Sequence, residues 1–350
     1  MITTARCFIL ALLLAATVLP VAAQPPLPTI IVAWGGDTMF GRGIAEGMAI
    51  PGHADPLALL RDRLAISDLQ IANLEGPLTT QPRVTANPYN LTAPPERVSL
   101  LVAAGFDAVS VANNHATDND RSGAAETVAT LREAGILPIG GGNNAEEAYA
   151  PVFIDHGGLR LALLAYDVTG ACFPATADAA GCARFDPATA RAAIAAAREQ
   201  ANVVIVQLHW GVEYAPTENQ EQRAIAHQLA AAGADAVIGH HPHVVQPVEW
   251  IARVGRRPTF VAYSLGNFVF DSYAEDARRG TLIETLLTTD GVIAFRALPF
   301  YTDWQGLVPL DTPEAHAALT ERLLPNLANR VSVQLKHGAW WMPPKSVRRQ

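Results

Sequence analysis

The chain has 350 residues, of which 50% are hydrophobic and 17% are charged, and its formal net charge at pH 7 is -8. This length and composition support one large domain or two medium ones with a sizeable buried core. The acidic balance argues against a nucleic-acid-binding protein, because such a protein needs a basic surface.

The beginning of the chain has the pattern of a secretory signal peptide. An apolar run, Phe8–Leu19, follows a single arginine, and the small residues Val21, Ala22 and Ala23 suit a signal peptidase. Because the run is too short for a typical membrane-spanning helix, we expect residues 1–23 to be cleaved. The mature protein would then be exported to the periplasm or cell envelope. An uncleaved membrane anchor is the alternative.

From residue 29 onward, apolar runs alternate with stretches of helical periodicity. Strands are predicted over residues 29–37, 69–76, 107–115, 136–141, 159–167, 202–211, 235–243 and 259–271. Helices are predicted over residues 56–65, 95–105, 124–135, 187–200 and 218–232. Strands that alternate with helices of this length indicate an α/β fold with largely buried sheets.

The last fifty or so residues have a different pattern. Residues 291–311 are typical of a β-hairpin or two edge strands, and residues 312–330 of a helix with Thr312 as its cap and Pro313 in its first turn. We therefore expect one domain over residues 28–300 and a C-terminal extension over residues 301–350.

Two cysteines remain once the predicted signal peptide and its Cys7 are removed. Cys172 and Cys182 lie in a polar, alanine-rich stretch. In an exported protein such a pair favours a disulfide that closes a surface loop, with two unpaired thiols as the alternative. The lack of a nearby histidine argues against a metal site there.

Polar side chains gather where the predicted strands end. Because ligands of α/β sheets bind beyond the carboxyl ends of the strands, we expect these side chains to converge. Carboxylates, amides and imidazoles are ligands for a divalent metal such as Zn, Mn or Fe. His241 and His243 are two residues apart, so in an extended segment both would point the same way. The strand-end residues are Asp37, Asn73, Glu75, Asn113, Asn114, His115, His209, His240, His241, His243, Ser264 and Asn267.

Six motifs, in this order, carry a family resemblance: GGDTMFGRG, IANLEGPL, VANNHATD, QLHWGVEY, GHHPHVVQPVE and YSLGNFVFD. Together they resemble the CapA-like capsule or poly-γ-glutamate synthesis family, which belongs to the metallo-dependent phosphatase-like superfamily. The resemblance implies an α/β fold of the metallophosphatase type, a four-layer αββα sandwich with two mixed β-sheets. It also implies a site for two divalent metal ions at the edges of the sheets.

The resemblance implies roles for particular residues. Glu75 matches the bridging carboxylate, and His115 matches the catalytic histidine. The first ion would have three protein ligands, because Met39 occupies the position where metallophosphoesterases usually place a histidine. The second ion would have four. The implied ligands are Asp37, Glu75 and His243 for the first ion, and Glu75, Asn114, His209 and His241 for the second.

Further residues have a predicted supporting role beside a structural alternative. Asp118 either orients His115 or caps the helix that begins near residue 119. Arg42 either binds an anionic substrate group or is an ordinary surface residue. Asn73 is expected to hold the loop of Glu75, and His240 to have a supporting or structural role. The remaining candidates for contact with substrate are Glu213, Tyr214 and Asn267.

These predictions lead to an exported metal-dependent hydrolase of phosphoesterase type. Two ions would activate water for attack on a phosphoryl or carbonyl centre, and His115 would protonate the leaving group. The resemblance places the activity in capsule or poly-γ-glutamate biosynthesis. The implied partners are an anionic polymer or its lipid-linked precursor, and membrane-bound polymer synthesis proteins. The alternatives are a non-catalytic accessory protein of polymer assembly or export, and a metal-dependent amide hydrolase of a γ-glutamyl polymer.

Overall fold

Two β-sheets pack face to face in the structure, a computed structural model that describes residues 27–84, 88–304 and 306–325. In these residues the larger sheet has eight strands in the order β16-β15-β14-β1-β2-β3-β4, with β13 paired to β1. Pairing is parallel from β1 to β4 and between β1 and β13, whereas β14, β15 and β16 are added in antiparallel fashion. The strands are β1 (Thr29–Thr38), β2 (Leu69–Leu74), β3 (Ala108–Ser110), β4 (Leu137–Ile139), β13 (Asn267–Val269), β14 (Arg279–Thr288), β15 (Gly291–Asp303) and β16 (Gly306–Pro309).

The smaller sheet has six strands within the same described ranges, in the order β11-β12-β10-β9-β7-β6. Its four central strands are parallel, and an antiparallel strand closes each edge. A short ladder of β5 (Gly141–Gly142) and β8 (Gly181–Cys182) stands apart. The strands of the smaller sheet are β6 (Val152–His156), β7 (Leu159–Asp167), β9 (Val203–His209), β10 (Ala236–His240), β11 (Val248–Arg253) and β12 (Arg256–Ala262).

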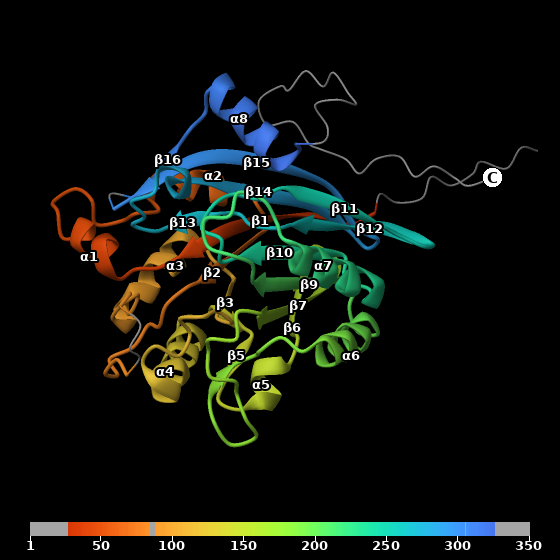
Figure 1. Cartoon of the computed structure of the whole chain (residues 1–350), viewed down its shortest axis with the longest axis horizontal. Coiled ribbons are helices and arrows are strands. Elements are labelled where there is room, and N and C mark those ends of the chain that lie inside the picture. The colour runs from red at the N-terminus through yellow and green to blue at the C-terminus, as the bar shows by residue number, and fades with distance from the viewer. Residues whose placement is uncertain (1–26, 85–87, 305, 326–350) are drawn as a thin grey trace, which may run out of the picture.

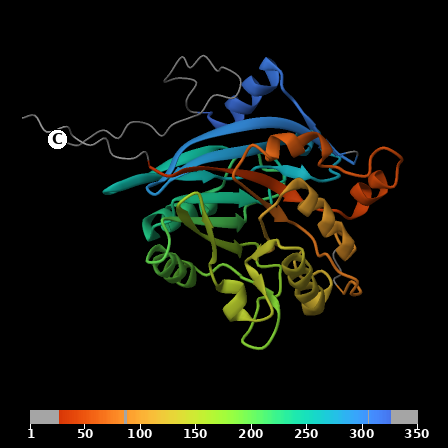
Figure 2. The same cartoon turned by 180° about the vertical axis from the view of Figure 1, so that it is seen from behind.

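Helices cover the outer faces of both sheets. One apolar cluster lies between the sheets, a second between the larger sheet and α1 to α3, and a third between the smaller sheet and α5 to α7. Figures 1 and 2 show α5, α6 and α7 on the side of the molecule away from β14 and β15, and α8 beside β15. The predicted four-layer α/β sandwich with two mixed sheets is confirmed. The helices are α1 (Arg42–Met48), α2 (Arg61–Leu64), α3 (Val98–Ala104), α4 (Asp120–Glu133), α5 (Ala145–Tyr149), α6 (Pro187–Arg198), α7 (Gln220–Ala232) and α8 (Pro313–Leu323).

The chain crosses between the two sheets within residues 259–271, which the sequence predicted as one strand. β12 ends at Ala262 in the smaller sheet, and β13 begins at Asn267 in the larger one. Two glycines permit the crossing: Gly266 has φ +70°, and a Cβ on Gly36 would lie 1.9 Å from the Gly266 oxygen. The crossing therefore brings the end of β12 directly against the end of β1.

Four of the described strands were not predicted: β6, β8, β11 and β14. In β14, Glu284 interrupts the apolar pattern, yet it is completely buried because Arg63 and Arg296 pair with its carboxylate. The predicted boundary at residue 300 falls inside β15, and β16 extends the same sheet. The described part of the C-terminal extension therefore continues the larger sheet.

The two ends of the chain carry predictions that the structure covers only in part. Thr312 caps α8 as predicted, since its side chain accepts a hydrogen bond from the Ala315 amide. The predicted signal peptide, residues 1–23, and residues 326–350 lie outside the described residues. Within the described ranges, none of the helices has both the length and the hydropathy that a membrane span requires.

Candidate metal centre

The carboxyl ends of parallel strands from both sheets meet at one site. Asp37 is paired with Asn73 in the register of β1 and β2, and His209 is paired with His240 in the register of β9 and β10. Because parallel strands deliver their last residues to the same edge, the sequence positions that follow these strands also arrive there. The structure brings all six predicted ligands into this site.

Glu75 lies at the centre of the cluster. Its Oε1 is 3.7 Å from Nε2 of His209 and 3.7 Å from Nε2 of His243. Two groups of three residues have ligand atoms within 4.8 Å of one another, and Glu75 belongs to both. The groups are Asp37, Glu75 and His209, and Glu75, His241 and His243. Such a shared position is what a bridging carboxylate requires.

The other ligand candidates close the cluster on either side of Glu75. Nδ1 of His243 is 3.4 Å from Oδ2 of Asp37. The imidazole ring of His241 lies 4.7 Å from that of His209 between centroids, and Nε2 of His209 is 2.8 Å from Oδ1 of Asn114. The predicted second set of ligands is therefore contiguous.

The Glu75 carboxylate has no conventional partner. The residue is completely buried, and neither oxygen has a hydrogen-bond partner within the part of the chain that the structure describes. Burial therefore raises the pKa of Glu75 well above its usual range, although the charge of His243 opposes this. A buried carboxylate without donors is costly unless a cation neutralises it. The buried Nδ1 of His241 lacks a partner in the same way. These residues fit a divalent cation.

The sequence predicted an extended segment for His241 and His243, and this prediction is wrong. Their φ angles are 97° and 60°, in the left-handed region that non-glycine residues rarely adopt. Pro242 separates them, and both rings nevertheless face the cluster, with centroids 6.1 Å apart. Strain of this kind typically accompanies a functional site.

The two histidines have opposite ionisation behaviour. Burial would lower the pKa of His243, but the carboxylates of Glu75 and Asp37 outweigh burial and raise it to about 10. Burial and the neighbouring His243 lower the pKa of His241 to about 4. In the metal-free protein, His243 is therefore the cation that balances the carboxylates.

We expect the metal-free protein to lose stability as the pH rises from 6.5, the ordinary pKa of histidine, to about 10. A raised pKa means that the folded state holds the proton more tightly than the unfolded chain does. The stabilisation is then complete below the unfolded pKa and is lost as the pH passes the folded one. The loss should be of the order of a few kcal/mol. Urea unfolding of chelated protein across this pH range would measure it, and His243→Asn should flatten the profile. An equally steep profile in the variant would contradict the prediction.

Met39, at the position where the resemblance would lead one to expect a histidine ligand, does not face the site. It is completely buried in the cluster between the larger sheet and its outer helices, together with Phe40 and Val269. The side chain therefore has a packing role, and the first predicted ion retains three protein ligands.

Asn73 and Asn113 form a chain of hydrogen bonds that supports the ligand candidates. Asn73 donates a hydrogen bond to Oδ1 of Asp37 at 2.8 Å, and its amide nitrogen is 3.3 Å from Nδ1 of His209. Asn113 in turn donates to Oδ1 of Asn73 at 3.2 Å and to the Leu74 oxygen at 2.8 Å. Asn73 thus links the two sheets. The sequence had predicted only that Asn73 holds the loop of Glu75.

His240 lies behind Asp37. Its Nε2 is 3.2 Å from Oε1 of Gln207, and its Nδ1 is 3.6 Å from Oδ1 of Asp37. Burial lowers the pKa of His240 to about 4 although Asp37 opposes this effect. His240, the first histidine of the GHHPH motif, is therefore a neutral support of the aspartate.

His115 and Asp118 form a buried pair beside the ligands. Nδ1 of His115 is 2.8 Å from Oδ2 of Asp118, and the two residues are only 5% and 3% exposed. Asp118 does not cap α4, because the helix cap is Asn119 and makes no side-chain cap hydrogen bond. Of the two predicted roles for Asp118, the structure favours orientation of His115.

Arg42 lies close to the candidate metal centre and is paired with Asp271. Its Nε donates to Oδ2 of Asp271 at 3.2 Å, and its guanidinium lies 5.7 Å from the ring centroids of Tyr89 and Phe270. The ring of Phe270 is 4.8 Å from that of His243. Arg42 therefore belongs to an aromatic rim of the site, and contact with substrate would add to its pairing with Asp271.

The other three predicted substrate contacts differ in exposure. Glu213 and Tyr214 are exposed, and the Tyr214 ring lies 6.0 Å from the ring of His243. Asn267 is completely buried: its Oδ1 is 2.8 Å from Nδ1 of His243, and its nitrogen donates to the Ala277 oxygen at 2.9 Å. Both polar atoms of Asn267 are thus occupied, which favours support of His243 over contact with substrate.

The cysteines are joined in the structure. Cys172 and Cys182 form a disulfide with their Cα atoms 6.4 Å apart, inside the usual range for such a bond. They lie close to the Asp167 carboxylate. Because the two sulfurs are bonded to each other, these three residues are not a second metal site.

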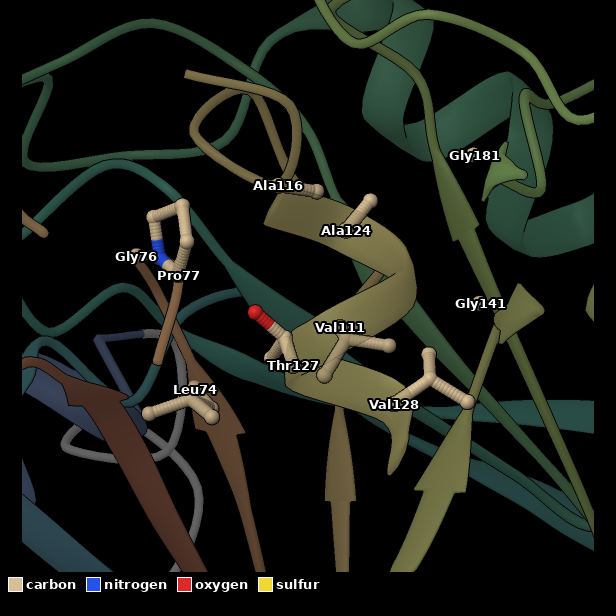
Figure 3. A pocket seen from close by; sticks show the side chains of 10 residues that line it. All are labelled: Leu74, Gly76, Pro77, Val111, Ala116, Ala124, Thr127, Val128, Gly141 and Gly181. Carbon is tan, nitrogen blue, oxygen red and sulfur yellow. The ribbon is translucent and has the colours of Figure 1, made fainter. Parts of the chain in front are cut away.

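The turn that carries Glu75 rests on an apolar floor. Figure 3 shows a small pocket in which Thr127 of α4 faces Leu74 and Pro77. The Thr127 hydroxyl accepts a hydrogen bond from the Leu78 amide at 3.0 Å. The free volume is about 10 Å³, which is room for roughly one water molecule. The turn of Glu75 therefore rests on α4 through this hydrogen bond and the apolar side chains around it.

The two packed sheets and the helices on their outer faces form a metallophosphatase-like fold. A solved structure described as a novel phosphatase from Mycoplasma pneumoniae has this fold, with a TM-score of 0.51 and 12% identity, over 83% of this chain and 97% of that chain. A family model described as bacterial capsule synthesis protein PGA_cap matches residues 31–272, so the chain belongs to this family. The resemblance drawn from the six motifs is confirmed.

Two relatives from Bacillus are similar to most of the chain. The PGA biosynthesis protein CapA of Bacillus subtilis is 31% identical over 268 residues, which are 75% of this chain and 69% of the relative. The capsule biosynthesis protein CapA of Bacillus anthracis is 30% identical over 275 residues, 75% of this chain and 65% of the relative. The chain thus spans about two thirds of the length of these relatives.

Proposed function

We propose that the protein is an exported metal-dependent hydrolase of phosphoesterase type that acts in capsule or poly-γ-glutamate biosynthesis. The observation that carries the proposal is the buried, unpartnered carboxylate of Glu75, which lies 3.7 Å from the imidazoles of His209 and His243. The fold of a phosphatase and the names of the Bacillus relatives support the setting. The proposed substrates are an anionic polymer or its lipid-linked precursor, delivered by membrane-bound synthesis proteins.

We assign the ligands to the two predicted sets that share Glu75. The two sets adjoin, because the groups of ligand atoms within 4.8 Å of one another join His209 to Asp37 and His241 to His243. Asp37 and His243 complete the first, and Asn114, His209 and His241 complete the second. Two divalent ions such as Mn, Zn or Fe, when bound, supply activation of water and neutralisation of the charge that develops on the substrate. Supporting residues keep two of the ligands in place. Asp37 is contacted by Asn73 and His240, and His243 is contacted by Asn267.

His115 is the proposed proton donor. The contact between its Nδ1 and Asp118 leaves Nε2 to carry the proton that a leaving oxygen needs, and the Asp118 carboxylate stabilises the charged ring. Both residues are nearly excluded from solvent, which limits exchange of this proton with bulk water. The same groups would serve cleavage of an amide in a γ-glutamyl polymer.

A non-catalytic accessory role in polymer assembly or export is the second candidate. The burial of Met39 in the apolar cluster favours it, because the first ion would then have only three protein ligands. Under this alternative the metal would stabilise the fold and a binding surface.

We expect purified protein to bind up to two divalent ions and to hydrolyse a phosphodiester substrate when Mn or Zn is supplied. Elemental analysis of the mature protein, followed by assays on phosphodiester and γ-glutamyl substrates, measures both. EDTA should remove activity, and added metal should restore it. Tight metal binding without hydrolysis of either substrate would support the accessory role, and protein that binds no metal would contradict both.

A further inference from the structure

The loop that the disulfide closes touches both sides of the metal centre. It follows β7 and contains Cys172 and Cys182, which are 2% and 1% exposed. Neither cysteine has a place in the proposed chemistry. The contacts of the loop, however, lead to the strand end of His209 on one side and to the turn of His115 on the other.

On the first side the loop is anchored to β9. The Val168 amide donates to the His209 oxygen at 2.9 Å, and Asp167 is paired with His209 in the register of β7 and β9. The Asp167 carboxylate then accepts hydrogen bonds from the amides of Thr169 at 3.0 Å and Gly170 at 3.1 Å. This turn leads directly into the disulfide.

On the second side the loop is anchored to the beginning of α4. The Phe173 amide donates to the Thr117 hydroxyl at 3.0 Å. Nη1 of Arg121 donates to the oxygens of Pro174 at 2.9 Å and Ala180 at 2.6 Å. The Arg121 guanidinium also lies 5.6 Å from the Phe173 ring centroid. One arginine thus holds both strands of the closed loop.

The two anchors flank a contact inside the site. Oδ1 of Asn114 meets Nε2 of His209 at 2.8 Å, and these residues belong to the segments that the loop connects. The turn of Asn114 ends in Asp120, whose φ of 62° is in the left-handed region. A strained turn of this kind persists only where its surroundings hold it.

We propose that the disulfide-closed loop 172–182 is a clamp that holds the turn of Asn114 and His115 against the end of β9, with Arg121 as its positioning residue. The disulfide keeps the carbonyls of Pro174 and Ala180 at the spacing that one guanidinium can reach. When the bond is absent, the loop has more conformations, and the turn loses its external support.

The test compares hydrogen–deuterium exchange of residues 113–121 in the native protein, Cys172→Ser/Cys182→Ser and Arg121→Ala. We expect exchange in this segment to be about tenfold faster in both variants. Arg121→Ala removes the hydrogen bonds between α4 and the loop, and the cysteine variant loosens the loop that supports the turn. Arg121→Lys keeps a cationic donor and should restore much of the protection. The matched control is Arg132→Ala on the same helix, where Arg132 pairs with Glu147 at the surface.

Affinity for Mn²⁺, measured by calorimetry, is the second readout and rests on the proposed function. It should fall several-fold in Arg121→Ala and remain native in Arg132→Ala. If native protein binds no Mn²⁺, the proposed function fails while the exchange result still decides the clamp. Native exchange rates over residues 113–121 in Arg121→Ala would overturn the clamp, and this variant keeps the disulfide should the cysteine variant fail to fold.

Discussion

Glu75→Gln should abolish metal binding and at the same time make the metal-free protein more stable. The substitution keeps the size of the side chain and removes the charge that both proposed ions share. Metal affinity should fall by more than a hundredfold, which exceeds the loss typical of a residue that only supports a ligand. Without metal, burial of the native carboxylate costs more than its attraction to His243 returns, as the raised pKa of Glu75 indicates. Removal of the charge should therefore contribute roughly 1–3 kcal/mol to the free energy of unfolding.

Calorimetry with Mn²⁺ and urea unfolding of chelated protein would measure the two effects. Glu213→Gln is the matched control, because Glu213 is a neighbouring exposed carboxylate and its substitution should change neither quantity much. A Glu75→Gln protein that binds metal normally would remove the basis of the proposed function. A variant that is destabilised without metal would mean that the attraction between Glu75 and His243 outweighs the cost of burying the carboxylate.

His241→Ala and His115→Ala should separate metal binding from catalysis. His241 has an unpartnered Nδ1 beside His209 and Glu75, so its removal should lower bound metal substantially and eliminate hydrolysis. His115 belongs to neither group of ligand atoms, so His115→Ala should keep its metal. Loss of a positioned general acid should still slow turnover by about 10²–10⁴-fold.

Metal stoichiometry, hydrolysis and capsule formation would be compared for both variants. Asp118→Asn should show a milder loss of turnover with native metal content, because it keeps the contact with His115 and loses the charge. The accessory role makes a different prediction, since capsule formation would then follow metal content alone. A His115→Ala protein that keeps its metal and fully supports capsule formation would leave the accessory role standing.

The sequence predicted which side chains would converge, because their positions follow from simple rules. Asp37, Glu75 and His209 come at or directly after apolar runs that are buried parallel strands, and parallel strands deliver their ends to one edge. The fold class follows from the same alternation of strands and helices. For such residues, the local sequence pattern is enough to predict the position in the folded protein.

Other parts depend on contacts between distant segments and left no local pattern. Glu284 is polar, yet it lies in the buried strand β14, because Arg63 supplies its partner from 221 positions away. Asn73 donates to Asp37 across two strands, and the crossing at Gly266 depends on the close approach of Gly36. The left-handed conformations of His241 and His243 are likewise imposed by the surrounding structure. A sequence read in short windows contains none of these partners.

The centre is assembled from segments at opposite ends of the domain, and this has a consequence for the biogenesis of the protein. The Asp37 carboxylate accepts a hydrogen bond from the His241 amide, 204 positions further along the chain. A ribosome that has made only the first half of the domain has therefore made an incomplete chelator. Under the proposed function, ion capture would follow synthesis of the segment that carries His241 and His243. An ion that binds the finished fold and not the unfolded chain would then favour maturation by mass action. Cellular metal supply would then set the yield of mature protein as well as its activity.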